Sequence, residues 1–418
     1  MATHERVLVT GMGAVAPNGN DVETIWASVL EGRSGIDHIV GVDVSELSVK
    51  IGGQVRGLDV NRYLTVAEQR RLDPSSIYGI AAAAEAMSTV LDEEGKHPFD
   101  PRRFSVLAAT GYGPTQIVHK GTRALDERGA RSVSPYSVVY GAADAASSFL
   151  SVRYHAQAAS HALSAACASG SVGVGEAMRT IRHGYADAVL VVGSEDSVNT
   201  QDLAGTANIR ALASDHNNTP TKASRPFDRS RSGFVMSCGG ASVLLESESS
   251  ATRRGARVLG EVIGYGSSSD AHHATAPHPE GLGARNSMTD ALVDAGIRVD
   301  AIDYVNAHGT GTAYNDSTEL AAISAVFGDF ATRIPISSTK SSTGHLIGAA
   351  GVLEAIFCLL VIRDGVVPPT INLDDPEFPE FDLVPHNARA CSVETAMSNS
   401  FGFGGHNATV IFSSGTGA

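Results

Sequence analysis

The sequence predicts an α/β protein. Short runs rich in β-branched residues, such as Val7–Thr10 and Ala188–Val192, alternate with longer alanine-rich stretches of helical spacing, as in proteins built from layers of strands and helices. Of the 418 residues, 43% are hydrophobic and 18% are charged, which is ordinary for a folded globular protein. The length exceeds the usual domain size of about 100–200 residues, so we expect two or three domains or one large α/β unit.

The predicted strands extend along the whole chain. Besides the two above, they are Ser105–Ala109, Ala241–Leu245, Tyr304–Asn306, Ile334–Ser337 and Ala408–Phe412. The segment Arg6-Val-Leu-Val-Thr-Gly-Met-Gly resembles Arg257-Val-Leu-Gly-Glu-Val-Ile-Gly-Tyr-Gly, and each opens a stretch of alternating strands and helices. This weak internal echo indicates two halves, residues 1–252 and 253–418.

Charge and hydropathy exclude several classes of partner. The 31 Lys and Arg residues against 45 Asp and Glu residues give a net charge of −14, which repels nucleic acid and anionic membranes. We therefore expect neither as a partner, and an acidic protein would need a local basic patch to bind. Leu346–Ile362 is the most apolar stretch, but it is short for a membrane span and contains Glu354, so it predicts a buried helix.

Cysteine usage predicts a reducing environment. The four cysteines are widely spaced and form no CxxC pair, so neither a disulfide framework nor a zinc site is expected. The N-terminal sequence lacks the long apolar core of a signal peptide, and we expect a cytoplasmic location.

Cys167 is predicted to lie just past a strand, at the N-terminus of a helix. Apolar residues recur at helical spacing from Val174 to Ile181, and Gly184 is a plausible end of that helix. Unpaired N–H groups at a helix N-terminus would lower the thiol pKa below its usual value of about 8.5. Local context leaves two interpretations open: a nucleophile with small neighbours that admit a substrate, or a buried and inert cysteine.

Two histidines stand at the ends of predicted strands. His308 follows Tyr304–Asn306, and His345 follows the strand ending near Ser337 and opens the long apolar helix. Open α/β sheets place their chemistry at such strand ends. The helix dipole would keep His345 neutral, and a neutral imidazole can donate a hydrogen bond to a developing oxyanion. Three charged residues lie nearby in sequence: Lys340, Asp316 and Glu319. The two acids could orient the site or pair with Lys340, or all three could form ordinary surface salt bridges.

The segment Gly402-Phe403-Gly404-Gly405 suits a backbone turn that presents an N–H group while Phe403 covers a pocket. That N–H and the N–H of Cys167 would together form an oxyanion hole. The alternative is a tight turn before the last strand.

A dinucleotide site near the N-terminus is not expected. Gly11-Met-Gly-Ala-Val-Ala16 matches a loose GxGxxA pattern, but Pro17-Asn18-Gly19 interrupts the helix start that such a site needs. No acidic residue follows a clear second strand either.

Four ordered motifs make the chain resemble the β-ketoacyl-ACP synthases, nearest to the synthase I/II branch and to the ketosynthase subunits of type II polyketide synthases. They are Ala-Cys167-Ala-Ser-Gly, Asn306-Ala-His308-Gly-Thr-Gly-Thr, Thr339-Lys340-Ser-Ser-Thr-Gly-His345 and Asn399-Ser-Phe-Gly-Phe403-Gly-Gly. The resemblance extends from about residue 6 to residue 413. It implies the thiolase fold, in which two pseudo-equivalent α/β halves stack as five α-β-α-β-α layers, usually as a dimer.

The resemblance also implies a set of roles. Cys167 would carry the acyl chain as a thioester, while His308 and His345 would assist decarboxylation of a malonyl unit and stabilise the enolate. Lys340 and Glu319 resemble the supporting pair of the family, and Phe403 resembles its gate and half of its oxyanion hole. The acyltransferase so implied requires no metal and no cofactor.

The implied partners are an acyl carrier protein, loaded with acyl or malonyl groups, and a second subunit. Carrier proteins are acidic, so Arg70, Arg71 and Arg210, which fall at positions resembling the carrier-docking surface, would provide the basic patch. The second subunit would make either a homodimer or a heterodimer with a chain-length-factor-like homologue.

Two departures from the family pattern stand out. Cys238 occupies the place of a usual acidic residue after Gly-Phe-Val, and Pro114 replaces an expected aliphatic residue at the rim of the acyl pocket.

Two other functions compete with condensation of carrier-bound thioesters. A non-condensing chain-length partner subunit would typically lack the nucleophile, and an NAD-dependent oxidoreductase would need the dinucleotide site. Cys167 and both histidines favour the condensing enzyme.

Overall fold

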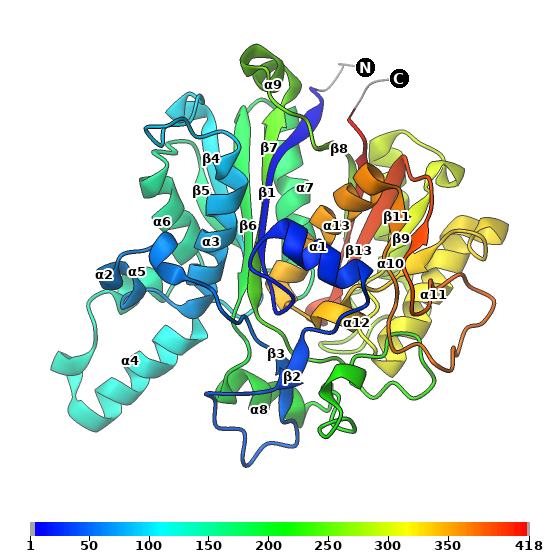
Figure 1. Cartoon of the computed structure of the whole chain (residues 1–418), viewed down its shortest axis with the longest axis horizontal. Helices are drawn as coiled ribbons and strands as arrows, with labels where there is room; N and C mark the ends of the chain where they lie inside the picture. Colours follow the sequence, from blue (N-terminus) through cyan, green and yellow to red (C-terminus); the bar gives the residue numbers. More distant parts are fainter. Residues whose placement is uncertain (1–4, 416–418) are drawn as a thin grey trace.

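The computed structural model describes residues 5–415 and shows a layered α/β architecture (Figure 1). Its main sheet has ten strands in the order β10-β9-β13-β14-β8-β1-β7-β6-β4-β5. The strands are β1 (Val7–Val15), β4 (Phe104–Ala109), β5 (Ser160–Leu163), β6 (Ala188–Glu195), β7 (Gly239–Ser247), β8 (Gly260–Ser269), β9 (Tyr304–Asn306), β10 (Ile336–Ser337), β13 (Thr395–Gly402) and β14 (His406–Ser413). Two small sheets pair β2 (Ile36–His38) with β3 (Ile51–Gly53) and β11 (Val366–Val367) with β12 (Arg389–Ala390).

The strand order repeats once along the chain. In the first half β5, β4 and β6 are parallel, and β7 and β1 continue antiparallel. In the second half β10, β9 and β13 are parallel, and β14 and β8 continue antiparallel. Each half uses its strands in the same sequence order, so the structure shows the two pseudo-equivalent halves of the thiolase fold. They are joined edge to edge where Leu8 and Val9 of β1 meet Glu261 and Gly260 of β8.

Helices complete the five layers, as Figure 1 shows. Helix α3 (Pro74–Ser88) covers the outer face of the first half, and α10 (Leu282–Ala295) covers that of the second. Helices α7 (Ser169–Arg182) and α13 (Ala350–Asp364) lie between the halves, since each contacts strands of both. The remaining helices are α1 (Val22–Leu30), α2 (Val66–Gln69), α4 (Thr115–Arg128), α5 (Ser137–Tyr140), α6 (Ala145–Arg153), α8 (Thr200–Asn208), α9 (Glu248–Arg254), α11 (Ala313–Phe327) and α12 (Lys340–Thr343).

The central helices pack backbone against backbone. A Cβ atom on Gly170 of α7 would lie 2.7 Å from the Val352 nitrogen, and one on Gly351 of α13 would lie 2.4 Å from the Ser171 nitrogen. Only glycine permits this approach. It brings the start of α7, two residues after Cys167, against the start of α13, five residues after His345.

The expected buried helix is confirmed, with a later start. The residues of α13 are buried from Ala350 to Val361, whereas Ile347–Ala349 form a 3₁₀ turn. His345 therefore does not open the helix, as the sequence predicted, but precedes it by five residues. In residues 5–415, no helix combines the length and the apolar character needed to cross a membrane.

The glycines of the loose GxGxxA pattern have a packing role. A Cβ atom on Gly11 would lie 2.2 Å from the Ala86 carbonyl oxygen, and one on Gly13 would lie 2.1 Å from that of Ala82. Helix α3 thus fills the space that a pyrophosphate would need.

Candidate active site

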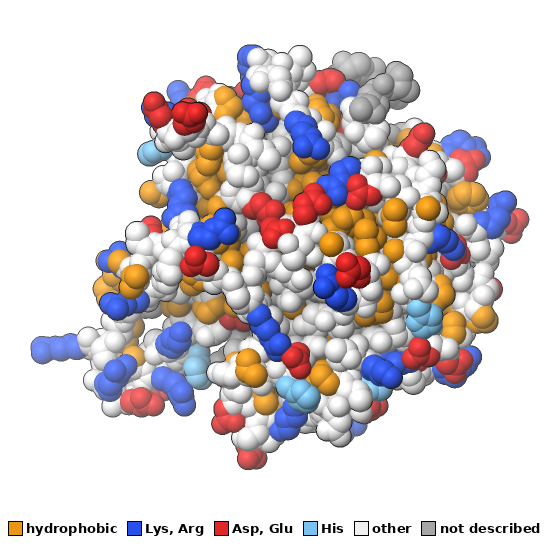
Figure 2. Space-filling view, in the orientation of Figure 1, with side chains coloured by type: hydrophobic (Ala, Val, Ile, Leu, Met, Phe, Trp, Pro, Cys, Tyr) orange, Lys and Arg blue, Asp and Glu red, His pale blue; other side chains and the backbone are white. Residues whose placement is uncertain are grey.

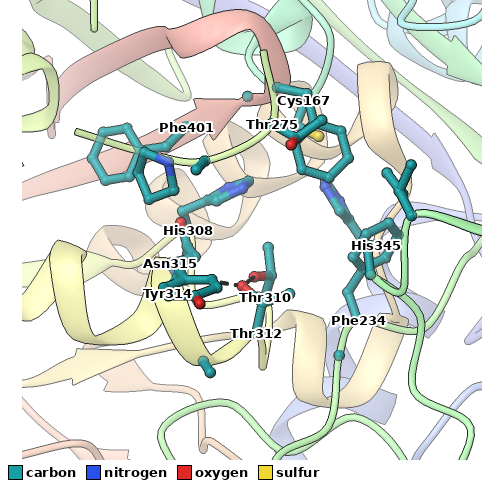
Figure 3. A pocket seen from close by; sticks show the side chains of 18 of the residues that line it. Cys167, Phe234, Thr275, His308, Thr310, Thr312, Tyr314, Asn315, His345 and Phe401 are labelled. Atoms are coloured by element: carbon teal, nitrogen blue, oxygen red, sulfur yellow. Dashed lines mark hydrogen bonds between the residues drawn. The ribbon is translucent and has the colours of Figure 1, made fainter. Parts of the chain in front are cut away.

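Cys167, His308 and His345 converge from three separate segments (Figure 3). Cys167 lies in the turn between β5 and α7, His308 follows β9, and His345 follows α12. One donor atom of each residue lies within 4.8 Å of the other two. All three residues are buried.

The turn that carries Cys167 is held from both halves of the chain. The Ala165 N–H donates to the Ser169 hydroxyl, and Ala166 has a left-handed backbone with φ of 49°. From the other half, Gly402 lies so close that a Cβ atom there would be 3.0 Å from the Cys167 nitrogen. The glycine before Phe403 therefore lets the two loops meet at the sulfur.

The Cys167 thiol is neutral in the resting protein. Burial raises its pKa to about 11, although the backbone N–H of Phe403 and the Lys340 ammonium act in the opposite direction. The expectation of a lowered pKa is therefore wrong. The physical reason is that α7 begins at Ser169, two residues after the sulfur, so the helix terminus contributes less than desolvation does.

Both imidazoles are neutral as well. Burial and the Lys340 ammonium hold the pKa of His345 well below its usual value, and burial, Lys340 and His345 do the same to His308. Neutrality was expected for His345, but its cause is burial rather than the dipole of α13. The two rings meet edge to face with centroids 5.3 Å apart.

The hydrogen bonds of His345 fix its tautomer. Its Nδ1 accepts from the Ile347 N–H at 3.3 Å, so the ring proton is on Nε2. That Nε2 is buried and has no partner, as is Nδ1 of His308. The site thus holds an unused donor on His345. A metal ion would need Nε2 deprotonated, so although the three residues are close enough to hold a soft cation, the tautomer favours donation to a substrate.

The supporting residues differ from the expected pairing. The Lys340 ammonium forms a buried ion pair with Glu354 of α13, not with Glu319. Glu319 instead accepts from the N–H groups of His308 and Gly309, both at 2.8 Å, and so fixes the turn that carries His308. Asp316 accepts from Phe227 N–H at 2.8 Å and has a structural role. Sequence analysis missed Glu354 as a partner, although a single acid inside the most apolar stretch was its signal.

A cavity of about 360 Å³ leads to the three residues. Its lining includes Phe234, Thr275, Thr310, Phe401 and Phe403. Phe234 meets the edge of His345 at 5.2 Å between centroids, and Phe401 meets His308 at 5.9 Å, two aromatic contacts that the sequence did not predict. The size and the mostly apolar walls suit a small organic group with a few polar anchors.

The three predicted docking arginines occupy two places. Arg210 is exposed at the cavity and has a left-handed backbone with φ of 57°. Arg70 and Arg71 are exposed at the end of α2, which is only four residues long. The Arg71 guanidinium lies 4.1 Å above the Tyr136 ring, next to α5. Figures 1 and 2 show that α2, α4 and α5 lie on the same side of the molecule, where Lys and Arg side chains gather.

The two departures from the family pattern have structural consequences. The Cys238 sulfur accepts from the Val55 N–H at 3.4 Å and lies beside the buried Asp196. Pro114 precedes the first residue of α4 and provides no side-chain cap.

Comparisons with known proteins agree with this geometry. Residues 4–251 match the family described as "Beta-ketoacyl synthase, N-terminal domain", and residues 259–374 match "Beta-ketoacyl synthase, C-terminal domain". The chain is 40% identical to 3-oxoacyl-[acyl-carrier-protein] synthase 2 of Synechocystis sp. over 98% of both chains. It is 41% identical to the Rhizobium meliloti protein of the same name over 99% of both. Among solved structures, the ishigamide ketosynthase/chain length factor is similar with a TM-score of 0.88 and 32% identity, over 99% of this chain and 100% of that one.

Proposed function

The chain belongs to the β-ketoacyl synthase family, and from this premise we propose that it condenses a Cys167-bound acyl chain with a malonyl unit delivered on a carrier protein. The observation that carries the proposal is the convergence of one thiol and two neutral imidazoles within 4.8 Å at a cavity. The named relatives are 3-oxoacyl-[acyl-carrier-protein] synthases, which supports the same reaction.

In the first step the Cys167 sulfur attacks the carbonyl of the acyl thioester. A new C–S bond forms, the bond to the carrier sulfur breaks, and the thiol proton leaves with the carrier thiol. The backbone N–H groups of Cys167 and Phe403 both act on the sulfur, so they are placed to bind the oxygen that becomes negative in this step. Because the resting thiol is neutral, its proton is lost during the attack and not before it.

In the second step the malonyl thioester loses its carboxylate as CO₂. The electron pair of the broken C–C bond forms an enolate, whose oxygen accepts the Nε2–H of His345 and a hydrogen bond from His308. The enolate carbon attacks the acyl–Cys167 carbonyl, a C–C bond forms and the bond to the cysteine sulfur breaks; the sulfur leaves as a thiolate and takes up one proton from solvent. The product is a β-ketoacyl carrier protein, and the buried Lys340 ammonium favours the negative charge throughout.

A mass experiment tests this function. Incubation with acyl-loaded carrier protein should add the mass of one acyl group to the wild-type enzyme, on the peptide that contains Cys167. Addition of malonyl-loaded carrier protein should then release a β-ketoacyl product. Cys167→Ala should lose both signals. Cys238→Ala, which removes another buried thiol, should keep them. Condensation by Cys167→Ala would overturn the mechanism.

The partners follow from the same proposal. A solved structure of a type II polyketide synthase acyl carrier protein in complex with its ketosynthase has a TM-score of 0.88 and 28% identity to this chain, over 99% of this chain and 100% of that one. We place carrier docking at Arg70, Arg71 and Arg210. The second subunit is a copy of this chain or a chain-length-factor-like homologue, and the exposed edge strand β5 supports such pairing.

We also propose a division of the chain into two halves and a cellular location. We assign the nucleophile to an N-terminal half, residues 1–252, and both histidines to a C-terminal half, residues 253–418. We also place the protein in the cytoplasm, where a reducing environment keeps the Cys167 thiol free.

A further inference from the structure

Glu195 is a buried acid next to the site that the proposed mechanism does not use. It is the last residue of β6, and its side chain is fully buried. Its carboxylate accepts from the N–H groups of Gly111 at 2.6 Å, Tyr112 at 3.2 Å and Gly348 at 3.1 Å. The Thr110 hydroxyl donates to it as well, at 3.2 Å.

These four donors belong to two segments, one of which leads to the nucleophile. The Ser169 hydroxyl contacts the carbonyl oxygens of Thr110, at 3.1 Å, and Ala166, at 2.7 Å. The Thr110 N–H donates to the Leu163 carbonyl at the end of β5. The loop held by Glu195 thus supports both ends of the turn that contains Cys167.

The other segment leads to His345. Gly348 lies in the turn Ile347–Ala349, and the Ile347 N–H is the donor that fixes the tautomer of His345. Ile347 has a left-handed backbone with φ of 48°, which a β-branched residue adopts only when its surroundings impose it. The hydrogen bond from Gly348 to Glu195 is such a constraint, one residue away.

We propose that Glu195 is a positioning residue, which sets the distance between the Cys167 sulfur and the His345 ring by holding both supporting loops on one carboxylate. It touches neither substrate nor reacting atoms. The inference rests on the proposed function, because the distance matters for condensation only if both groups act on one substrate.

The ionised carboxylate is the form that the geometry requires. Three backbone N–H groups and one hydroxyl point at its two oxygens, and a protonated carboxyl or an amide would direct a hydrogen at one of these donors. Burial raises the pKa of Glu195 to about 7, so protonation occurs within the working range. Two titratable groups interact electrostatically with Glu195, namely Cys167 and Tyr112. Both have raised pKa values, so both stay neutral near pH 7.

The test is Glu195→Gln, which keeps the size of the side chain and removes the charge. At pH 8 we expect kcat for condensation to fall about 10- to 100-fold, because displaced reacting groups slow the chemical step. KM for both carrier substrates should stay unchanged within about twofold. Because Glu195 itself becomes protonated below pH 7 in the wild type, the ratio of the wild-type kcat to the Glu195→Gln kcat should shrink towards 1 at pH 5.5. Iodoacetamide should still label Cys167 at no less than about one third of the wild-type rate, since this small probe needs no second group.

The matched control is Glu85→Gln. Glu85 is also largely buried, with a pKa raised to about 7, and accepts from the backbone N–H groups of Ala14 and Val22, away from the cavity. It should lose comparable stability but keep kcat and its pH profile. If Glu195→Gln does not fold, Thr110→Val removes one of the four donors and should lower kcat about 3- to 10-fold.

The outcomes separate cleanly. Equal kcat for wild type and Glu195→Gln at pH 8, or a kcat ratio that does not change with pH, overturns the positioning role. Equal losses in Glu195→Gln and Glu85→Gln overturn it too, because they show a general effect of stability. A wild type that labels at Cys167 but forms no β-ketoacyl product overturns the proposed function instead.

Discussion

The buried pair of Lys340 and Glu354 provides the sharpest energetic prediction. Their side chains are only 2% and 3% exposed; Lys340 pairs with Oε1 of Glu354, and the buried Oε2 has no hydrogen-bond partner. Removing one member of a buried pair leaves an uncompensated charge, which costs about 3–5 kcal/mol, whereas replacing both members is often nearly neutral. Lys340→Met and Glu354→Gln should each lower the free energy of unfolding by that amount, and the double variant should lose less than either.

Urea unfolding followed by the fluorescence of the single tryptophan measures this. Trp26 is buried, stacks on Phe357 of α13 and donates to Asp364, so its emission reports on the helix that carries Glu354. Wild type, the two single variants and the double variant should together give a coupling energy of at least about 3 kcal/mol between Lys340 and Glu354. Additive losses in the double variant would refute the pairing.

Glu319 provides the comparison for this cycle. Its carboxylate is satisfied by two backbone N–H groups, so its coupling to Lys340 should stay below about 1 kcal/mol. A larger coupling to Glu319 than to Glu354 would restore the pairing that the sequence predicted.

Three further predictions concern titration and docking. With a thiol pKa of about 11, the iodoacetamide rate of Cys167 should rise about tenfold per pH unit from pH 7 to pH 10, and a plateau by pH 8 in labelling followed by mass would contradict it. Asp196 has a pKa raised to about 7, so its contribution to stability is full below about pH 4 and is lost as the pH rises through 7. Asp196→Asn should therefore stabilise more at pH 8 than at pH 5, by up to about 2–3 kcal/mol in urea unfolding, and an equal effect at both pH values would argue against an ionising Asp196. Replacing Arg70 and Arg71 with Glu should raise KM for the acyl carrier protein about tenfold, while acylation by a small thioester stays intact. The control Arg298→Glu, at an exposed site of the other half, should change neither activity. Equal loss of both activities in the Arg70 and Arg71 variant would rule out carrier docking at these two residues.

The sequence predicted elements well because strands and helices depend on local patterns. The strand Tyr304–Asn306 was confirmed with its bounds, and the strand predicted at Ile334–Ser337 begins only at Ile336. The order of the strands was available only through the resemblance, because β1 pairs with β7 and β8, whose paired residues are all more than 220 positions away along the chain. Long-range pairing leaves no local trace.

The site shows the same division between local and distant causes. The turns that carry Cys167, His308 and His345 were predicted from glycines, strand ends and motifs. The protonation of Cys167 was not, because burial by loops from both halves sets its pKa. The partner of Lys340 was not either, since Glu354 is 14 residues ahead on another helix, and only the fold brings them together.

A single cause explains why the thiol and both imidazoles are neutral. Burial penalises every charged form, so it raises the pKa of Cys167 and lowers those of His308 and His345, and the Lys340 ammonium adds to the latter effect. The thiol and the two imidazoles therefore carry no charge in the resting site, yet the site holds hydrogen-bond donors and a nearby cation, Lys340, that attract negative charge. Such a site stabilises an oxyanion or enolate more than it stabilises the neutral thioesters from which they form. The high thiol pKa is thus no obstacle to condensation, because the same burial that disfavours a free thiolate strengthens the hydrogen bonds to the charge that develops on the substrate.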